Sequence, residues 1–95
     1  MFKLGKMYLT NGINIEIGDS NIFAKEIMKC IGRYRRKDWG ELPEEDKELN
    51  EKAIQNGNDR ILAAYQTSKG KIYIITEYTE ELKDFVTTVM FASEY

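Results

Sequence analysis

The clearest candidates for binding chemistry are four cations that recur every three or four residues in the first half of the chain. Because residues three or four apart lie on the same side of an α-helix, this spacing predicts a basic stripe. Such a stripe could bind the phosphates of DNA or RNA, or could be an ordinary solvated face. No aromatic platform is interleaved with it, so sequence-specific readout is not predicted. The predicted nucleic-acid-binding residues are Lys25, Lys29, Arg33 and Arg36.

A run of acidic residues follows directly. In "KDWGELPEEDKELN", residues 37–50, it surrounds the only tryptophan and the only proline of the chain. These carboxylates could occupy a basic cleft of a partner, pair with the basic stripe, or complement the N-terminus of a helix. Trp39 could anchor a partner or pack over the junction of two helices. The predicted partner-binding residues are Asp38, Trp39, Glu41, Glu44, Glu45 and Glu48.

The composition restricts catalysis and metal binding. The chain has no histidine and one cysteine, Cys30, so Cys/His zinc sites, Ser–His–Asp triads and internal disulfides are excluded. The acidic run lacks the glycine turn and spaced ligands of a calcium loop, so neither a metal nor another cofactor is predicted. We therefore predict no catalytic residues and a protein that is not an enzyme. The lesser alternative, a histidine-free enzyme such as a small nuclease, would use Arg60, Thr76, Glu77, Thr87 and Thr88.

Length and composition indicate one globular domain spanning residues 1–95, with 42% hydrophobic and 32% charged residues. The net charge of −2 conceals two opposed blocks. Residues 1–37 hold eight basic and three acidic residues, whereas residues 38–59 hold two basic and eight acidic ones. No apolar run approaches the roughly 20 residues of a membrane-spanning helix, and the N-terminus is too polar for a signal peptide. The expected location is the cytoplasm, with no membrane partner.

The elements that must position these residues begin with extended structure. Residues 7–10 and 13–17 alternate on either side of the turn dipeptide Asn11-Gly12. This pattern predicts a β-hairpin, with a single strand followed by a loop as the alternative.

Two helices are predicted next. The first begins at the N-cap residue Ser20 and ends within residues 32–37. The second spans residues 43–57, from a proline at its first position to a glycine stop, with a thin apolar face of Leu49 and Ala53.

The rest of the chain predicts three strands over residues 60–67, 71–78 and 85–95, with an acidic loop over residues 79–84. Short connections favour an antiparallel meander. The predicted fold is therefore α+β: an N-terminal strand or hairpin, two helices packed on one sheet face, and a three-stranded meander.

The order of five segments resembles a known family: "LGKMYLTNGI", "KDWGEL", "DRILAAY", "KIYIITE" and "TTVMFASEY". This family comprises small, mostly uncharacterised bacterial proteins of phages, plasmids and integrative elements, labelled plasmid-related proteins. The resemblance covers nearly the whole chain and implies a mobile-element origin. Small proteins of such elements are often inhibitors of host defence, including anti-CRISPR proteins.

Together these observations predict a non-enzymatic binding protein that inhibits a host defence complex by occupying a charged surface. The alternative is a small nucleic-acid-binding accessory protein that uses the basic stripe. The opposed charge blocks also allow self-association into a homodimer.

Overall fold

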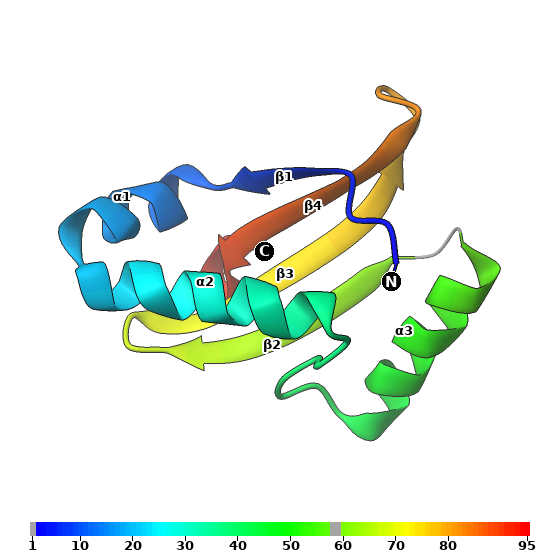
Figure 1. Cartoon of the computed structure of the whole chain (residues 1–95), viewed down its shortest axis with the longest axis horizontal. Coiled ribbons are helices and arrows are strands. Elements are labelled where there is room, and N and C mark those ends of the chain that lie inside the picture. The colour runs from blue at the N-terminus through cyan, green and yellow to red at the C-terminus, as the bar shows by residue number, and fades with distance from the viewer. Residues whose placement is uncertain (1, 58–59) are drawn as a thin grey trace.

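The computed structural model describes residues 2–57 and 60–95 of the chain. Within these residues it has three α-helices, a sheet of four strands and one 3-10 helix (Figure 1). The order is β1 (Lys6–Leu9), α1 (Asn11–Asp19), α2 (Asn21–Arg35), α3 (Glu44–Asn56), β2 (Ile61–Thr67), β3 (Gly70–Thr79), β4 (Asp84–Phe91) and η1 (Ala92–Glu94). The predicted α+β class is confirmed.

The sheet is mixed, with the strand order β1-β4-β3-β2. Strands β2, β3 and β4 form the antiparallel meander that the sequence predicts. Strand β1 joins the outer edge of β4 in parallel and pairs Lys6 with Val86 and Leu9 with Val89. The prediction of a three-stranded sheet was therefore incomplete, because a short extended segment carries no signal for its distant partner strand.

Residues 11–19 form helix α1 and not the hairpin strand that the sequence predicts. The N-cap is Thr10, whose Oγ1 accepts a hydrogen bond from the Ile13 N–H at 3.3 Å. Ile13 is fully buried and Ile17 packs against the core, whereas Ile15 is exposed. Ile13 and Ile17 lie four residues apart, so they share one side of a helix as well as one face of a strand. The alternation therefore fits both structures, and only packing on the sheet selects the helix.

Helix α2 has the predicted bounds. Its N-cap Ser20 accepts a hydrogen bond at Oγ from the Phe23 N–H at 3.1 Å, and the helix ends at Arg35. The buried positions recur at helical spacing and face the sheet. They are Phe23, Ile27, Cys30 and Tyr34.

Helix α3 buries Ala53, as the sequence predicts, but not Leu49. Pro43 lies at the N-cap instead of the first helical position, and Gly57 ends the helix in the left-handed conformation, with φ at 77°. The buried side chains are Asn50 and Ala53, whereas Leu49, which was predicted to pack inward, is 60% exposed. Successive helical residues are about 100° apart, so burial of Asn50 carries Leu49 to the solvent side.

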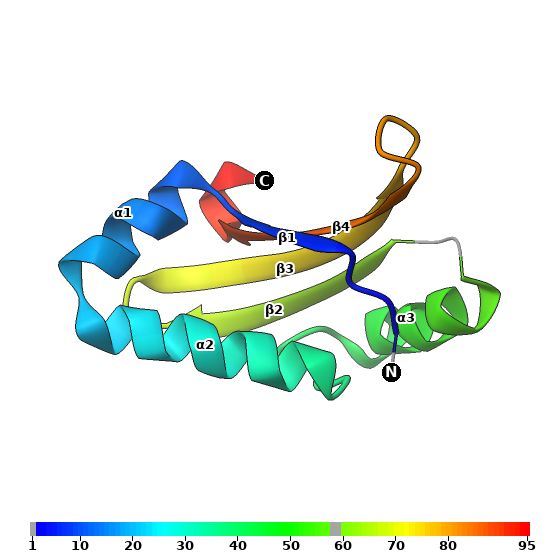
Figure 2. The same ribbon diagram turned by 45° about the horizontal axis from the view of Figure 1, so that its top comes forward.

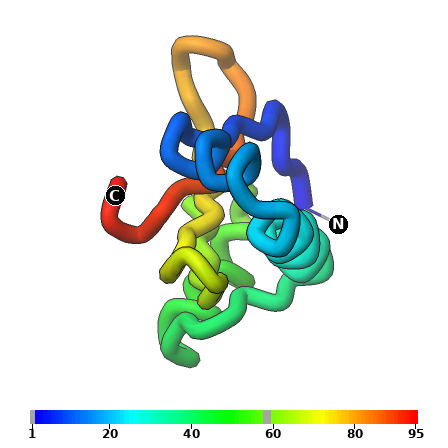
Figure 3. Tube along the Cα trace, turned by 90° about the vertical axis from the view of Figure 1, so that its left-hand side faces the viewer, coloured from blue at the N-terminus to red at the C-terminus, as the bar shows by residue number. Residues whose placement is uncertain are grey.

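Helices α1 and α2 lie on one face of the sheet, and the C-terminal turn lies on the other. Helices α1 and α2 cover one face, while α3 lies beside strand β2 (Figure 2). The sequence predicts that the last strand continues to Tyr95, but β4 ends at Phe91 and η1 then turns back over the other face. Figure 3 shows α2 and this C-terminal turn on either side of the sheet. The core lies between the sheet and α1 and α2, and it continues to α3 through Trp39 and Ala53.

Candidate binding surfaces

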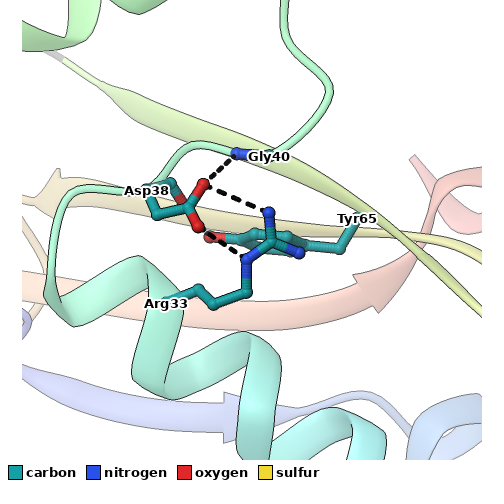
Figure 4. Close-up of polar contacts among 4 residues, drawn as sticks. All are labelled: Arg33, Asp38, Gly40 and Tyr65. Carbon is teal, nitrogen blue, oxygen red and sulfur yellow. Dashed lines mark hydrogen bonds and ion pairs between the residues drawn. The ribbon is translucent and has the colours of Figure 1, made fainter.

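The basic block and the acidic block are joined within the same chain by an ion pair between Arg33 and Asp38. The Arg33 guanidinium donates from Nε to Asp38 Oδ2 at 2.7 Å and from Nη2 to Oδ1 at 3.2 Å (Figure 4). The same guanidinium lies 4.9 Å from the ring centroid of Tyr65. These hydrogen bonds hold the pKa of the Asp38 carboxyl below its usual range and raise the pKa of Arg33. Arg33, a predicted nucleic-acid contact, and Asp38, a predicted partner contact, thus neutralise each other's charge.

The Arg33–Asp38 pair fixes the turn between α2 and α3. Asp38 Oδ1 accepts a hydrogen bond from the Gly40 N–H at 3.1 Å, and the Tyr65 hydroxyl donates to the Asp38 carbonyl at 2.7 Å (Figure 4). Burial of the Tyr65 phenol raises its pKa. The turn then runs beside strand β2 as a short parallel bridge between Gly40 and Ala64. It is therefore a fixed part of the sheet edge.

Trp39 lies in the core of this junction. Its ring centroid is 5.6 Å from that of Phe2 and 5.5 Å from that of Tyr34, and the side chain is only 4% exposed. The indole N–H donates to Glu51 Oε2 at 3.1 Å. The interpretation of Trp39 as a surface anchor is therefore wrong, and the alternative, packing at the helix junction, is correct. An indole in an interhelical loop is driven inward by its large apolar area.

Asn50 holds α3 against the sheet, and sequence analysis did not identify it. Its side chain is 3% exposed. The amide Nδ2 donates to the Leu62 carbonyl at 2.7 Å, and Oδ1 accepts from the Leu62 N–H at 3.1 Å. The amide thus occupies the outer edge of β2 as a neighbouring strand would. An asparagine within a charged helix gives no sequence signal for this role.

The outer face of α3 is the main acidic surface. Glu44 Oε1 forms an ion pair with Lys47 Nζ at 3.6 Å. In the preceding turn, Glu41 Oε1 accepts a hydrogen bond from Gln66 Nε2 at 3.3 Å. Three further exposed carboxylates form no ion pair with another residue that the structure describes. They are Glu45, Asp46 and Glu48.

We define the α3 surface as Glu45, Asp46, Glu48 and the exposed Leu49. A pocket of about 200 Å³ adjoins it between α3 and β2. Its lining residues are Leu42, Asp46, Leu49, Asn50, Arg60 and Leu62. The structure thus places Leu49, which the sequence predicted to pack inward, on the surface beside the predicted carboxylates and next to a pocket.

The basic stripe on α2 is shorter than predicted. Lys25, Lys29 and Arg36 are exposed on the outer side of the helix. Arg33, the fourth member, forms an ion pair with Asp38 and lies over the ring of Tyr65. Three cations therefore face solvent on this helix side.

The residues of the alternative enzyme site lie on two different faces of the sheet. Thr76 and Thr87 are buried on the helix-covered face, with their hydroxyl oxygens 2.7 Å apart. Glu77 and Thr88 alternate with them and face the other way. Arg60 instead hydrogen-bonds to the hydroxyl of the C-terminal tyrosine. The five residues are not brought together.

The two buried threonines belong to a chain of hydroxyl groups. Thr87 donates to the Leu4 carbonyl at 2.7 Å, so its oxygen accepts the proton of Thr76. The Tyr34 hydroxyl lies 2.7 Å from Thr76 and is then the donor. Burial raises the pKa of Tyr34, which keeps this hydroxyl protonated. The threonines therefore satisfy a buried polar network and have no surface role.

Within residues 2–57 and 60–95, no group of three or more acidic or cysteine side chains is arranged to hold a metal ion. No helix in this part of the chain is both long and apolar enough to cross a membrane. Comparisons with protein-family models, with curated proteins and with solved structures found no match for this chain.

Proposed function

We propose that the protein is a cytoplasmic, non-enzymatic binding protein that captures a positively charged protein partner on the α3 surface. The observation that supports this is Leu49, which is 60% exposed one helical turn after Glu45 and Asp46 and which lines a pocket. Binding hot spots typically combine an apolar anchor with a polar rim. The α3 surface has both parts.

The size of the adjoining pocket favours a protein partner over a small molecule. At about 200 Å³ it lies below the usual range for small-molecule sites, about 300–1,000 Å³. It suits a single aliphatic side chain of a partner. The neighbouring Asp46 carboxylate would then meet a cation that flanks that side chain.

Two buried contacts pre-organise the α3 surface. Asn50 ties the helix to the backbone of β2, and Glu51 accepts the indole N–H of Trp39. A helix held in this way loses little conformational entropy when a partner binds. The tryptophan predicted as a contact thus supports the contact surface from inside.

The family resemblance suggests the class of partner. A mobile-element origin points to a host defence complex, and complexes that handle nucleic acid carry basic clefts. Carboxylates on a rigid helix could enter such a cleft and compete with the nucleic acid. Long-range attraction between opposite charges would speed the encounter.

The direct test measures cleavage by candidate defence nucleases in excess protein, together with pull-down from cells that carry them. Leu49→Ser is expected to weaken capture about tenfold or more. The matched control is Ile22→Ser, which removes a similarly exposed apolar side chain from α2. Full nuclease activity in excess protein, across the candidate complexes, counts against the proposal.

A second pair of variants tests the charges. Glu45→Lys with Glu48→Lys should slow association and reduce its salt dependence. Glu80→Lys with Glu81→Lys makes the same change of charge in the exposed β3–β4 turn, far from α3 (Figure 1). Equal effects from both pairs would mean that net charge alone matters and would contradict a specific α3 surface.

A further inference from the structure

The outer side of α2 carries a projecting apolar side chain between cations. Met28 is 71% exposed. Lys25 lies one turn before it and Lys29 directly after it, and both are exposed. The Arg36 guanidinium lies close to Gly32, because a Cβ on that glycine would be 3.4 Å from Arg36 Nη1. These positions fall within about 100° of the helix circumference. We define the α2 surface as Lys25, Met28, Lys29 and Arg36.

The cations of the α2 surface are not neutralised by a carboxylate of their own helix. Glu26 is the one acidic residue of α2, and it accepts hydrogen bonds from the Ser68 N–H at 3.0 Å and the Ser68 hydroxyl at 2.6 Å. Lys25, Lys29 and Arg36 form no ion pair with any residue that the structure describes. These three cations therefore remain available to an acidic partner.

Helices α2 and α3 carry opposite charges of equal size. Helix α2 holds four cations and one carboxylate, and α3 holds five carboxylates and two lysines, so their net charges are +3 and −3. The two helices diverge from the turn that joins them (Figure 1). Because that turn is a fixed part of the sheet edge, the α2 and α3 surfaces can meet only between two copies of the chain.

The two surfaces also match in their apolar parts. The α3 surface presents Leu49 and a pocket of about 200 Å³, which suits one aliphatic side chain flanked by a cation that reaches Asp46. Met28 is such a side chain, because it is unbranched and flexible enough to fill irregular gaps, and two lysines flank it. Arg60, the cation that lines the pocket, hydrogen-bonds to Tyr95. The pocket thus favours the α2 surface in shape and in charge.

We propose that the α2 surface of one copy of this chain docks on the α3 surface of a second copy. The inference rests on the proposed function, since it names one partner for the same site. Self-association would cover the α3 surface at high concentration, so a target would have to displace the second copy. Because the contact joins two different surfaces, further copies can add until the arrangement closes.

Sedimentation velocity of the purified chain, at concentrations up to about 1 mM, tests this contact without any target. The average mass should rise with concentration at low salt and fall towards that of the monomer at high salt, because salt screens exposed charges. Met28→Ser should weaken self-association about tenfold or more. Ile22→Ser is the matched control, since Ile22 is similarly exposed but lies about 120° away on the same helix, and it should have no effect.

Charge reversal identifies the two surfaces that meet. Lys25→Glu with Lys29→Glu, and separately Glu45→Lys with Glu48→Lys, should each give a monomer. An equal mixture of these two variants should associate again, because each variant supplies the surface that the other lacks.

The matched control reverses two lysines outside the α2 surface. Lys6 and Lys71 lie on the sheet face opposite α1 and α2, and Lys6→Glu with Lys71→Glu changes the net charge by the same amount as the α2 reversal. This variant should self-associate like the wild type. Equal loss in the control and in the α2 variant would mean that net charge alone drives association, and would overturn the proposal.

The outcomes separate self-association from target capture. A wild-type chain that stays monomeric at low salt, or a mixture of reversed variants that stays monomeric, overturns the self-association alone. A monomer that binds a DNA duplex through Lys25 and Lys29 also overturns it, by assigning the α2 surface to nucleic acid. Self-association without inhibition of any candidate nuclease would overturn only the proposed function. If both proposals hold, the α2 variant should keep target capture, because its α3 surface is intact.

Discussion

Replacing Gly40 with alanine tests whether the turn between α2 and α3 is held by its bridge to β2. Gly40 has φ of +72°, and a Cβ placed on it would lie 2.0 Å from the Ala64 carbonyl oxygen. The turn must therefore move away from β2. Movement breaks two backbone hydrogen bonds, from the Ala64 N–H to the Trp39 carbonyl at 3.2 Å and from the Glu41 N–H to the Ala64 carbonyl at 2.8 Å.

The expected cost has two parts. A non-glycine residue in the left-handed region costs about 1–2 kcal/mol. Each lost hydrogen bond adds about 0.5–1.5 kcal/mol. Gly40→Ala should thus lower the free energy of unfolding by about 2–5 kcal/mol, a large share of the 5–15 kcal/mol typical of a domain.

Gly57 provides the matched control for Gly40→Ala. Its φ is +77°, but a Cβ there meets nothing within 4 Å. Gly57→Ala should therefore cost only the conformational part, about 1–2 kcal/mol.

Urea unfolding followed by Trp39 fluorescence measures both variants, because this buried indole reports on the turn. A shift of native Trp39 emission towards the exposed value is expected for Gly40→Ala alone. If the two variants are equally stable, the bridge to β2 does not hold the turn and the reasoning is refuted.

Two further predictions concern the polar contacts. Thr87→Val keeps the shape of the side chain but removes the hydroxyl between Thr76 and the Leu4 carbonyl, so urea unfolding should show a loss of about 1–3 kcal/mol. Asp38→Asn should abolish the pH-dependent part of the ion pair with Arg33. Because the pKa of Asp38 is lowered on folding, its contribution is complete above the unfolded value of about 4 and disappears as pH falls through the folded value. The stability gap between wild type and variant should therefore be constant near neutral pH and close below about pH 4.

Each of these predictions has a control on the surface. Thr88 lies on the sheet face opposite α1 and α2. Thr88→Val should therefore change the free energy of unfolding by no more than about 0.5 kcal/mol. A loss equal to that of Thr87→Val would remove the argument for a buried hydroxyl network. Glu45→Gln removes an exposed carboxylate of α3 that pairs with no described cation, so it controls for the loss of one negative charge. A gap for Asp38→Asn that persists at low pH would show that the ion pair contributes little.

The sequence predicted the elements whose signals are local. The N-cap Ser20 and the helical spacing of apolar residues located α2, and the alternation of β3 marked the inner strand. The same reasoning failed over residues 11–19, because Ile13 and Ile17 fit both periodicities. It also placed Leu49 inside, because a thin apolar face cannot show that an asparagine is the residue to be buried.

For the candidate surfaces as well, the sequence predicted some features and packing decided others. Exposed carboxylates on α3 and cations on α2 could be recognised from charge alone, because long charged side chains stay in water wherever the helix packs. The sequence could not show that Arg33 and Asp38 neutralise each other. Their geometry depends on how α2 ends, which packing on the sheet decides.

By itself the sequence determined the fold class, most element bounds, the opposed charge blocks and the absence of histidine chemistry. These properties depend on residue type and short-range periodicity. Only the tertiary structure decided that β1 joins β4, that Trp39 is buried, that Asn50 covers the edge of β2, and that Leu49 is exposed beside a pocket. Each of these depends on contacts between residues far apart in the chain, whose free energy is gained only when the whole sheet assembles.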